Sequence, residues 1–326
     1  MPIKKNLILG TIANYDFEVL RPFLMTLRKT GYAGDIVFFY SNISEKTLQK
    51  LKGFGVALVP FSTVFPYLDA TFSKHIVWPS NGRRITSLKV HSLRFLLEYC
   101  YLTEYGDKYI YVMHTDTRDV IFQKDPFEFP IDKHLCCFTE NEKMSIGDSE
   151  INARWIRTDF GDEMLVDLAD KPIVCSGVTI GPVEAMLHYL QIFIDTMVKY
   201  DVPKLVGSIE ADQSVHNYII HRNLVPDLML YKNNAGPVLT LALEDRVYLT
   251  SDGLIRNQQG EIPAVVHQYD RHWHIAKRYW SLRFIWRMRI AYVRGKLAQV
   301  MCLHAPALYR AFMSVRLAFR NFISKR

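Results

Sequence analysis

The sequence predicts an α/β fold in which a mostly parallel central sheet is flanked by helices, with a basic helical tail at the carboxyl end. Short apolar strands alternate with helical segments over the first hundred residues, at the spacing of βα units. The run at residues 109–113 is nearly continuously apolar and rich in aromatic and β-branched residues, which is typical of a strand buried on both faces. Hydrophobic residues make up 49% of the 326 residues, enough for a large packed core.

The expected elements can be placed in chain order from these patterns. Strands are expected at residues 6–12, 35–40, 55–60, 109–113, 135–138, 173–175, 178–180 and 264–266. Helices are expected at residues 17–29, 44–52, 85–101, 182–199 and 213–221. The second of these helices begins with a Ser44 cap and has Glu45 in its first turn, where both residue types stabilise a helix. Residues 141–170 are polar and are expected to run over the surface.

The net charge of +7 conceals a strong asymmetry along the chain. No acidic residue follows Asp270, and residues 271–326 hold 13 of the 40 Lys and Arg; the rest has 27 basic and 33 acidic residues, a charge of −6. We therefore predict a globular domain at residues 1–275 and a basic, aromatic helical tail at residues 276–326. Such a tail suits an anionic membrane surface, whereas the acidic body disfavours nucleic acid.

Two further features concern location. No apolar run is long enough for a membrane span or a signal-peptide core. The five cysteines have no CxxC spacing, which indicates small core residues in a reducing compartment.

In the tail, five apolar residues share one helical face: Leu308, Phe312, Val315, Phe319 and Phe322. The expected location is cytoplasmic, peripheral on the inner face of a membrane.

An acidic turn follows the strand at residues 109–113. Asp116 and Asp119 lie between two apolar segments, where unpaired carboxylates are costly. In open α/β sheets, ligands bind outside the carboxyl ends of strands, and a divalent cation carrying a substrate phosphate accounts for both features. The alternative is an ordinary charged turn in which Arg118 pairs with an aspartate.

Other candidate residues lie at strand ends and helix starts. At the end of the first strand, Asn14 can reach a base edge and Tyr15 can stack on it, or the two are a turn residue and a core aromatic. Lys89 and Arg94 can reach a diphosphate or the acidic turn, or they belong to a solvated helix surface. His267 ends the last strand and is a metal-ligand or a structural histidine.

Two short segments complete the candidate site. Asp212 and Gln213 begin a helix, where capping alone would also explain the carboxylate. Ser176 and Gly177, between two apolar runs, indicate a tight turn or a close backbone approach that an acceptor sugar can use.

Taken in order, these segments resemble the GT-A-fold nucleotide-sugar glycosyltransferases, most closely family 8, which includes glycogenin and bacterial lipo-oligosaccharide galactosyltransferases. The resemblance covers residues 6–275 and rests on the segments Asn14-Tyr15, Arg94 with Glu98-Tyr99, Asp116 to Val120, Cys175 to Val178, Asp212-Gln213 with Asn217, and His267 with Arg271 and Trp273. Two positions depart from the family pattern. The acidic pair is spaced DxxD instead of DxD, and Cys175 stands where the family has asparagine.

The resemblance implies metal-dependent transfer of a sugar from a nucleotide diphosphate donor, UDP-linked, to a hydroxyl of a glycan or glycolipid. It implies Mn²⁺ or Mg²⁺ on Asp116, Asp119 and His267. Donor binding is expected at Thr11, Asn14, Tyr15, Lys89, Arg94, Asp116 and Arg271, and acceptor contacts at Ser176 and Gly177. Asp212 and Gln213 are the expected catalytic residues: Asp212 as a general base in an inverting enzyme, or the pair as sugar-orienting groups in a retaining one.

Two alternatives remain open from the sequence. A nucleotidyltransferase also uses a Rossmann-like sheet and carboxylate-bound metal, but it usually has a Gly-rich basic loop after the first strand, and residues 10–17 are not one. The other alternative is a non-catalytic sugar- or membrane-binding protein with the same fold. Metal-dependent hydrolysis of a nucleotide sugar would separate an enzyme from a binder.

Overall fold

A computed structural model of the chain describes residues 4–61, 90–200, 211–287 and 290. It contains two compact units, the first ending at His272 and the second beginning at Trp273. Lys89 and the apolar stripe of the predicted tail at residues 308–322 lie outside the described residues. Among the described helices, none is long and apolar enough to cross a membrane.

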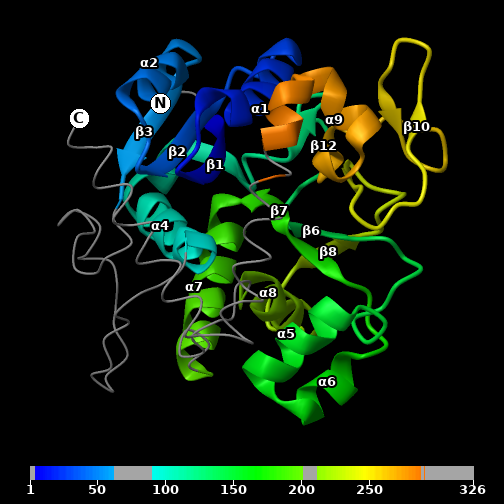
Figure 1. The fold of residues 1–326 in the computed structure, drawn as a ribbon. Helices are drawn as coiled ribbons and strands as arrows, with labels where there is room; N and C mark the ends of the chain where they lie inside the picture. The colour runs from blue at the N-terminus through cyan, green and yellow to red at the C-terminus, as the bar shows by residue number, and fades with distance from the viewer. Residues whose placement is uncertain (1–3, 62–89, 201–210, 288–289, 291–326) are drawn as a thin grey trace, which may run out of the picture. The chain divides into compact units, whose positions relative to one another are not determined.

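The first unit is built on a seven-stranded sheet with the order β3-β2-β1-β4-β7-β6-β8 (Figure 1). Its strands are β1 (Lys5–Ala13), β2 (Asp35–Ser41), β3 (Val56–Pro60), β4 (Tyr109–Thr115), β6 (Leu135–Thr139), β7 (Val174–Pro182) and β8 (Leu228–Tyr231). Only β7 runs antiparallel to its neighbours, β4 and β6, and the other pairs are parallel. The predicted α/β class with a mostly parallel sheet flanked by helices is confirmed.

Helices cover both faces of this sheet because side chains alternate along its strands. The helices are α1 (Phe17–Lys29), α2 (Glu45–Gly53), α4 (Val90–Tyr105), α5 (Glu150–Phe160), α6 (Asp162–Leu168), α7 (Val183–Lys199) and α8 (Ala211–His221). Leu7 and Leu9 of β1 belong to a core cluster that is completed by side chains of α4, α7 and α8. On the opposite face, Phe38 of β2 packs edge-on against Phe23 of α1, with ring centroids 5.6 Å apart.

Three sequence expectations differ from the structure. Residues 174–182 form one strand, β7, instead of two strands joined by a turn, because its second half pairs with β4 and its first residue, Val174, pairs with Thr139 of β6. Residues 141–170 are not a simple surface excursion: α5 and α6 form a small core of their own around Ile156 and Leu165. In β4, burial on both faces begins only at Val112, since Ile110 is 47% exposed.

A smaller three-stranded sheet brings distant parts of the chain to the end of β4. Its order is β5-β12-β9, formed by β5 (Val120–Phe122), β12 (Val265–His267) and β9 (Val238–Thr240). β5 and β12 are antiparallel, and His267 is the register partner of Val120. The acidic turn between β4 and β5 therefore lies beside the end of β12. A separate hairpin joins β10 (Tyr248–Leu249) and β11 (Ile255–Arg256).

The second unit contains α9 (Trp273–Tyr279) and further helical residues at 282–287 and 290. Trp280 and Phe284 are buried, with ring centroids 5.3 Å apart. Leu282, Trp286 and Ile290, which are spaced four apart, are exposed. This part of the basic segment therefore presents large apolar side chains to solvent.

One buried carboxyl group predicts a pH-dependent stability. Asp159 of α5 accepts a hydrogen bond from Ser214 of α8, its other oxygen is buried and has no partner among the described residues, and burial raises its pKa from 3.8 to about 6. The folded protein therefore binds this proton more tightly than the unfolded chain. The stabilisation is complete below pH 4 and is lost as the pH rises through 6, by up to about 3 kcal/mol.

Asp159→Asn is expected to raise the free energy of unfolding at pH 7.5 and to flatten its pH dependence between pH 4 and 7, because the neutral amide needs no proton. Urea denaturation at several pH values measures this effect. Asp167→Asn, at an exposed carboxylate of α6, is the matched control and should leave the pH dependence of stability unchanged. A variant at residue 159 with the pH dependence of the unaltered chain would contradict the prediction.

Candidate metal-binding and active site

The acidic turn is fixed in place through its backbone. Asp116 N donates to Gly177 O at 2.8 Å, and the carbonyl of Asp119 accepts from Gln268 N at 2.7 Å. Between them, the Thr117 hydroxyl donates to Thr11 O of β1 at 3.2 Å, and its methyl group occupies the space that a Cβ at Gly10 would need. These contacts tie the turn to β7, to the end of β12 and to β1, so its two carboxylates have defined positions.

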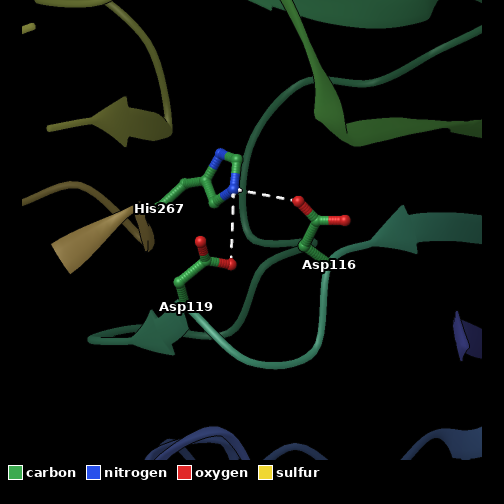
Figure 2. Close-up of side chains that lie close together, drawn as sticks. All are labelled: Asp116, Asp119 and His267. Carbon is green, nitrogen blue, oxygen red and sulfur yellow. Dashed lines mark ion pairs between the residues drawn. The ribbon is translucent and has the colours of Figure 1, made fainter. Parts of the chain in front are cut away.

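The side chains of Asp116, Asp119 and His267 converge on one point (Figure 2). His267 Nε2 lies 3.3 Å from Asp116 Oδ2 and 3.7 Å from Asp119 Oδ1. Although His267 is only 1% exposed, its Nε2 makes no hydrogen bond within the described residues. An octahedral ion about 2.1 Å from its ligands places neighbouring ligand atoms about 3 Å apart and opposite ones about 4 Å apart. The three side chains can therefore hold a metal ion.

Arginines hold the other oxygen of each carboxylate. Arg94 Nη1 binds Asp116 Oδ1, and Arg118 Nη2 donates to Asp119 Oδ2 at 3.0 Å. Each aspartate therefore has one carboxylate oxygen directed toward His267 Nε2 and the other bound to an arginine guanidinium group. The charged-turn alternative, in which Arg118 pairs with an aspartate, is also present, and it is compatible with metal binding because it uses a different oxygen of Asp119.

Gly177 allows the cluster to form. A Cβ at this position would lie 2.7 Å from Asp116 Oδ2 and 2.8 Å from His267 Nε2, in the space between the ligand atoms. The expected turn at Ser176-Gly177 is wrong, but the expected close approach of the backbone is present. Any larger residue would displace Asp116 or His267.

The protonation states of Asp116 and His267 determine how the cluster can accept a cation. Burial alone would raise the pKa of Asp116, but Arg94 and His267 hold it well below its usual value. Burial lowers the pKa of His267, whereas Cys175, Asp116 and Asp119 raise it, and together they hold it well above its usual value. Without a metal, the imidazole therefore keeps a proton that a metal ion would have to displace.

Arg94 links the metal cluster to the expected catalytic pair. Its side chain is buried, and Nη2 donates to Asp212 Oδ2 at 2.8 Å and to Ser176 O at 3.2 Å. The second oxygen of Asp212 accepts from Gln213 N at 2.9 Å. Both Asp212 oxygens are thus already engaged, which favours an orienting and charge-stabilising role over a general base. The solvated-helix alternative for Arg94 is wrong.

A second basic group lies on the other side of the turn. Arg118 Nη2 is 3.3 Å from Asp270 Oδ2, and Arg271 Nη2 is 3.8 Å from Asp119 Oδ2. Arg271 is the more exposed of the two guanidinium groups. Of the two, Arg271 is the better placed to meet an anion that approaches from solvent.

The residues expected to contact the nucleotide base differ in their surroundings. Asn14 has a φ of 58°, is exposed and accepts a hydrogen bond from Asn42, as a turn residue does. Tyr15 is half-buried; burial raises its pKa, and the charges of Arg118, Asp119 and Asp116 also act on its hydroxyl group. The hydroxyl of Thr11 is buried and has no hydrogen-bond partner in the part of the chain that the structure describes. Thr11 and Tyr15 thus adjoin the acidic turn, while Asn14 stands at the surface.

Four side chains in and around the site make contacts that the sequence did not reveal. Glu140 is buried just after β6 and accepts from Gln213 Nε2 at 3.0 Å. Glu98 and His114 form a fully buried pair at 2.6 Å, and His114 Nε2 lies 3.2 Å from Ser176 O. The Cys175 thiol lies 3.3 Å from His267 Nδ1. Glu140 was detectable by its place after a strand, whereas the others lie inside regular elements and carry no local signal.

Comparison with known proteins does not assign this site. The sequence matches no protein-family model, and no curated protein matches it significantly. The functional inferences below therefore depend on the residues and geometry of this chain.

Proposed function

We propose that this chain is a metal-dependent glycosyltransferase of GT-A fold that transfers a sugar from a nucleotide diphosphate donor, most fittingly a UDP-sugar, to a hydroxyl of a glycan or lipid-linked acceptor. The observation that carries the proposal is the convergence of Asp116, Asp119 and His267 at the carboxyl end of the central sheet, with one oxygen of each aspartate directed toward His267 Nε2. Ligands of open α/β sheets bind at this edge. A metal there would meet a donor diphosphate directly.

Asp116, Asp119 and His267 would hold the metal. An imidazole with two carboxylates suits Mn²⁺ better than Mg²⁺, because Mg²⁺ prefers oxygen ligands alone. When bound, the ion supplies Lewis-acid stabilisation of the diphosphate leaving group. The proposed cofactor is therefore Mn²⁺, with Mg²⁺ as a weaker substitute.

In the proposed reaction, the bond between the anomeric carbon and the diphosphate oxygen breaks, and the electron pair leaves with the diphosphate. The acceptor oxygen forms the new bond to the anomeric carbon, and its proton passes to the departing diphosphate oxygen. Arg271 and Arg118 provide fixed positive charge on the side where the diphosphate leaves. Thr11, Asn14 and Tyr15 are the proposed nucleotide contacts; Lys89, the other proposed donor contact, lies outside the described residues.

Asp212 and Gln213 are proposed to face the donor sugar from the start of α8. Arg94 holds the Asp212 carboxylate, and the Gln213 amide donates to Glu140 and to Asn152 Oδ1 at 3.2 Å. Ser176, beside them on β7, is proposed to contact the acceptor together with Gly177. This arrangement supports positioning of the sugar and stabilisation of positive charge at the anomeric carbon.

The proposed location is cytoplasmic, on an anionic membrane surface where a lipid-linked acceptor would be found. Leu282, Trp286 and Ile290 are exposed on the described part of the basic segment. Arg283 and Arg287, next to them, are exposed as well. Exposed aromatic and aliphatic side chains beside arginines suit the headgroup region of a bilayer, and each basic residue near anionic lipid adds about 1 kcal/mol.

Flotation with vesicles containing phosphatidylglycerol tests this membrane contact. The full chain is expected to float at low salt and to be released as salt rises. The double substitution Leu282→Ser with Trp286→Ser should remove most of the binding. Val166→Ser, at an exposed apolar residue of α6, is the matched control and should float like the unaltered chain. Equal flotation of the double variant, or none of the full chain, would refute membrane attachment by this surface.

A two-step assay tests the proposed enzymatic function. A thermal-shift screen of nucleotide sugars with and without Mn²⁺ should identify a donor, because a ligand of the native state raises its stability by mass action. That donor should then be hydrolysed slowly by the chain in the presence of Mn²⁺ and without acceptor. Stabilisation without turnover would favour the sugar-binding alternative, and release of pyrophosphate from a nucleoside triphosphate would favour a nucleotidyltransferase.

A further inference from the structure

We propose that Cys175, supported by Glu140, is a positioning residue that orients His267 for metal binding. The inference rests on the metal centre of the proposed function but not on sugar transfer. Cys175 Sγ lies 3.3 Å from His267 Nδ1, and both side chains are at most 2% exposed. His267 therefore has one ring nitrogen in contact with the thiol, while the other faces Asp116 and Asp119 and makes no hydrogen bond to any residue that the structure describes.

The neighbours of the thiol set the direction of these hydrogen bonds. The Glu140 carboxyl group lies beside the thiol and accepts from Gln213 Nε2. In the proposed arrangement, the thiol donates to Glu140 and its sulfur accepts from the Nδ1–H of His267. This arrangement leaves the Nε2 lone pair for a metal, because the proton on one ring nitrogen determines which nitrogen can be a ligand.

Direct ligation by Cys175 fits the structure less well. The thiol contacts Nδ1, on the opposite side of the ring from the atoms that converge on the metal position. The cysteine thus supports the ligand instead of being one, which gives a physical reason for its departure from the asparagine of the family pattern.

The same chain of contacts reaches α8. From His267 it passes through Cys175 and Glu140 to Gln213, the residue beside Asp212. On the other side of the cluster, Arg94 joins Asp116 to Asp212. Two separate paths therefore connect the metal ligands to the start of α8. Cys175 lies on the first path, which contacts the imidazole ring of His267.

Titration of Mn²⁺ alone, followed by the EPR signal of the free ion, tests the proposal on the full-length chain. Cys175→Val keeps the volume of the side chain but removes both hydrogen bonds, and it is expected to weaken Mn²⁺ binding about tenfold or more. Cys175→Ser keeps a donor and an acceptor and should bind within a few-fold of the unaltered chain. Cys137→Val changes an equally buried cysteine of β6 and should leave Mn²⁺ affinity unchanged.

Glu140→Gln tests the other end of the chain and remains informative if Cys175→Val fails to fold. Its amide introduces a competing N–H donor beside the thiol, so a several-fold loss of Mn²⁺ affinity is expected. Normal Mn²⁺ affinity of Cys175→Val, an equal loss in Cys137→Val, or normal affinity of Glu140→Gln would overturn the proposal. Because no nucleotide sugar is present, Mn²⁺ binding by the unaltered chain tests the metal centre, and the ratio of variant to unaltered affinity tests this inference.

Discussion

Asp119→Ala and His267→Ala are each expected to abolish sugar transfer and Mn²⁺ binding while the chain stays folded. Each substitution removes one of three ligand side chains from a site whose ligand atoms lie within 4.8 Å of one another. Two remaining ligands cannot hold the ion against water with useful affinity. In the unaltered chain, excess chelator should remove activity and added Mn²⁺ should restore it.

Product formation and Mn²⁺ affinity measure this effect, and circular dichroism checks the fold. Asp35→Ala, at an exposed carboxylate that begins β2 at the opposite end of the sheet, is the control and should leave Mn²⁺ binding and transfer unchanged. Full activity in excess chelator would exclude the proposed metal centre. So would Mn²⁺ affinity that survives both substitutions.

The affinity for Mn²⁺ should also fall at acid pH. Despite the opposing effect of burial, Cys175, Asp116 and Asp119 hold the pKa of His267 well above its usual value, so the metal-free ring carries a proton. The ion must displace that proton, and binding therefore becomes weaker as the pH falls below the pKa of His267. Calorimetry in buffers of different ionisation enthalpy should detect proton release on Mn²⁺ binding. Binding without any proton release would contradict the protonated state of the metal-free site.

Asp212→Asn is expected to retain donor binding and to lower turnover by about a hundredfold or more. The amide oxygen can still accept from Gln213 N, so the start of α8 keeps its hydrogen bond. Arg94, however, loses one of the two carboxylates that it joins. The field at the proposed sugar site becomes more positive, which opposes the positive charge that develops on the sugar in the transition state.

The alternative role of Asp212 is structural, and the two roles predict different measurements. Loss of a helix cap costs about 1 kcal/mol of stability and leaves turnover unchanged. Ser44→Ala removes the cap of α2, where Ser44 Oγ accepts from Thr47 N at 3.3 Å, and it provides the comparison. Both variants should be measured for turnover, donor affinity and melting temperature. If Asp212→Asn behaves like Ser44→Ala, Asp212 is only a cap.

Some of the site was predictable because its signals are local. Asp116 and Asp119 follow a buried strand, and His267 ends another, so each could be assigned to a strand end from the sequence around it. The placement of ligands at carboxyl ends of strands then predicted that they meet. The structure confirms that the three side chains form a cluster able to hold a metal ion. Which ion they bind and what reaction they support remain proposals.

The sequence by itself determined the α/β class, the helices at residues 17–29 and 44–52 with the cap at Ser44, and the acidic turn after β4, because periodicity, caps and turns depend on neighbouring residues. Only the tertiary structure decided that residues 174–182 form one antiparallel strand, that Arg94 joins Asp116 to Asp212, and that Cys175 lies on His267. Each of these depends on partners far away in the sequence: Arg94 and Asp212 are 118 residues apart, and Cys175 and His267 are 92 apart. Their hydrogen bonds form only when the strands and helices pack, so no local pattern records them.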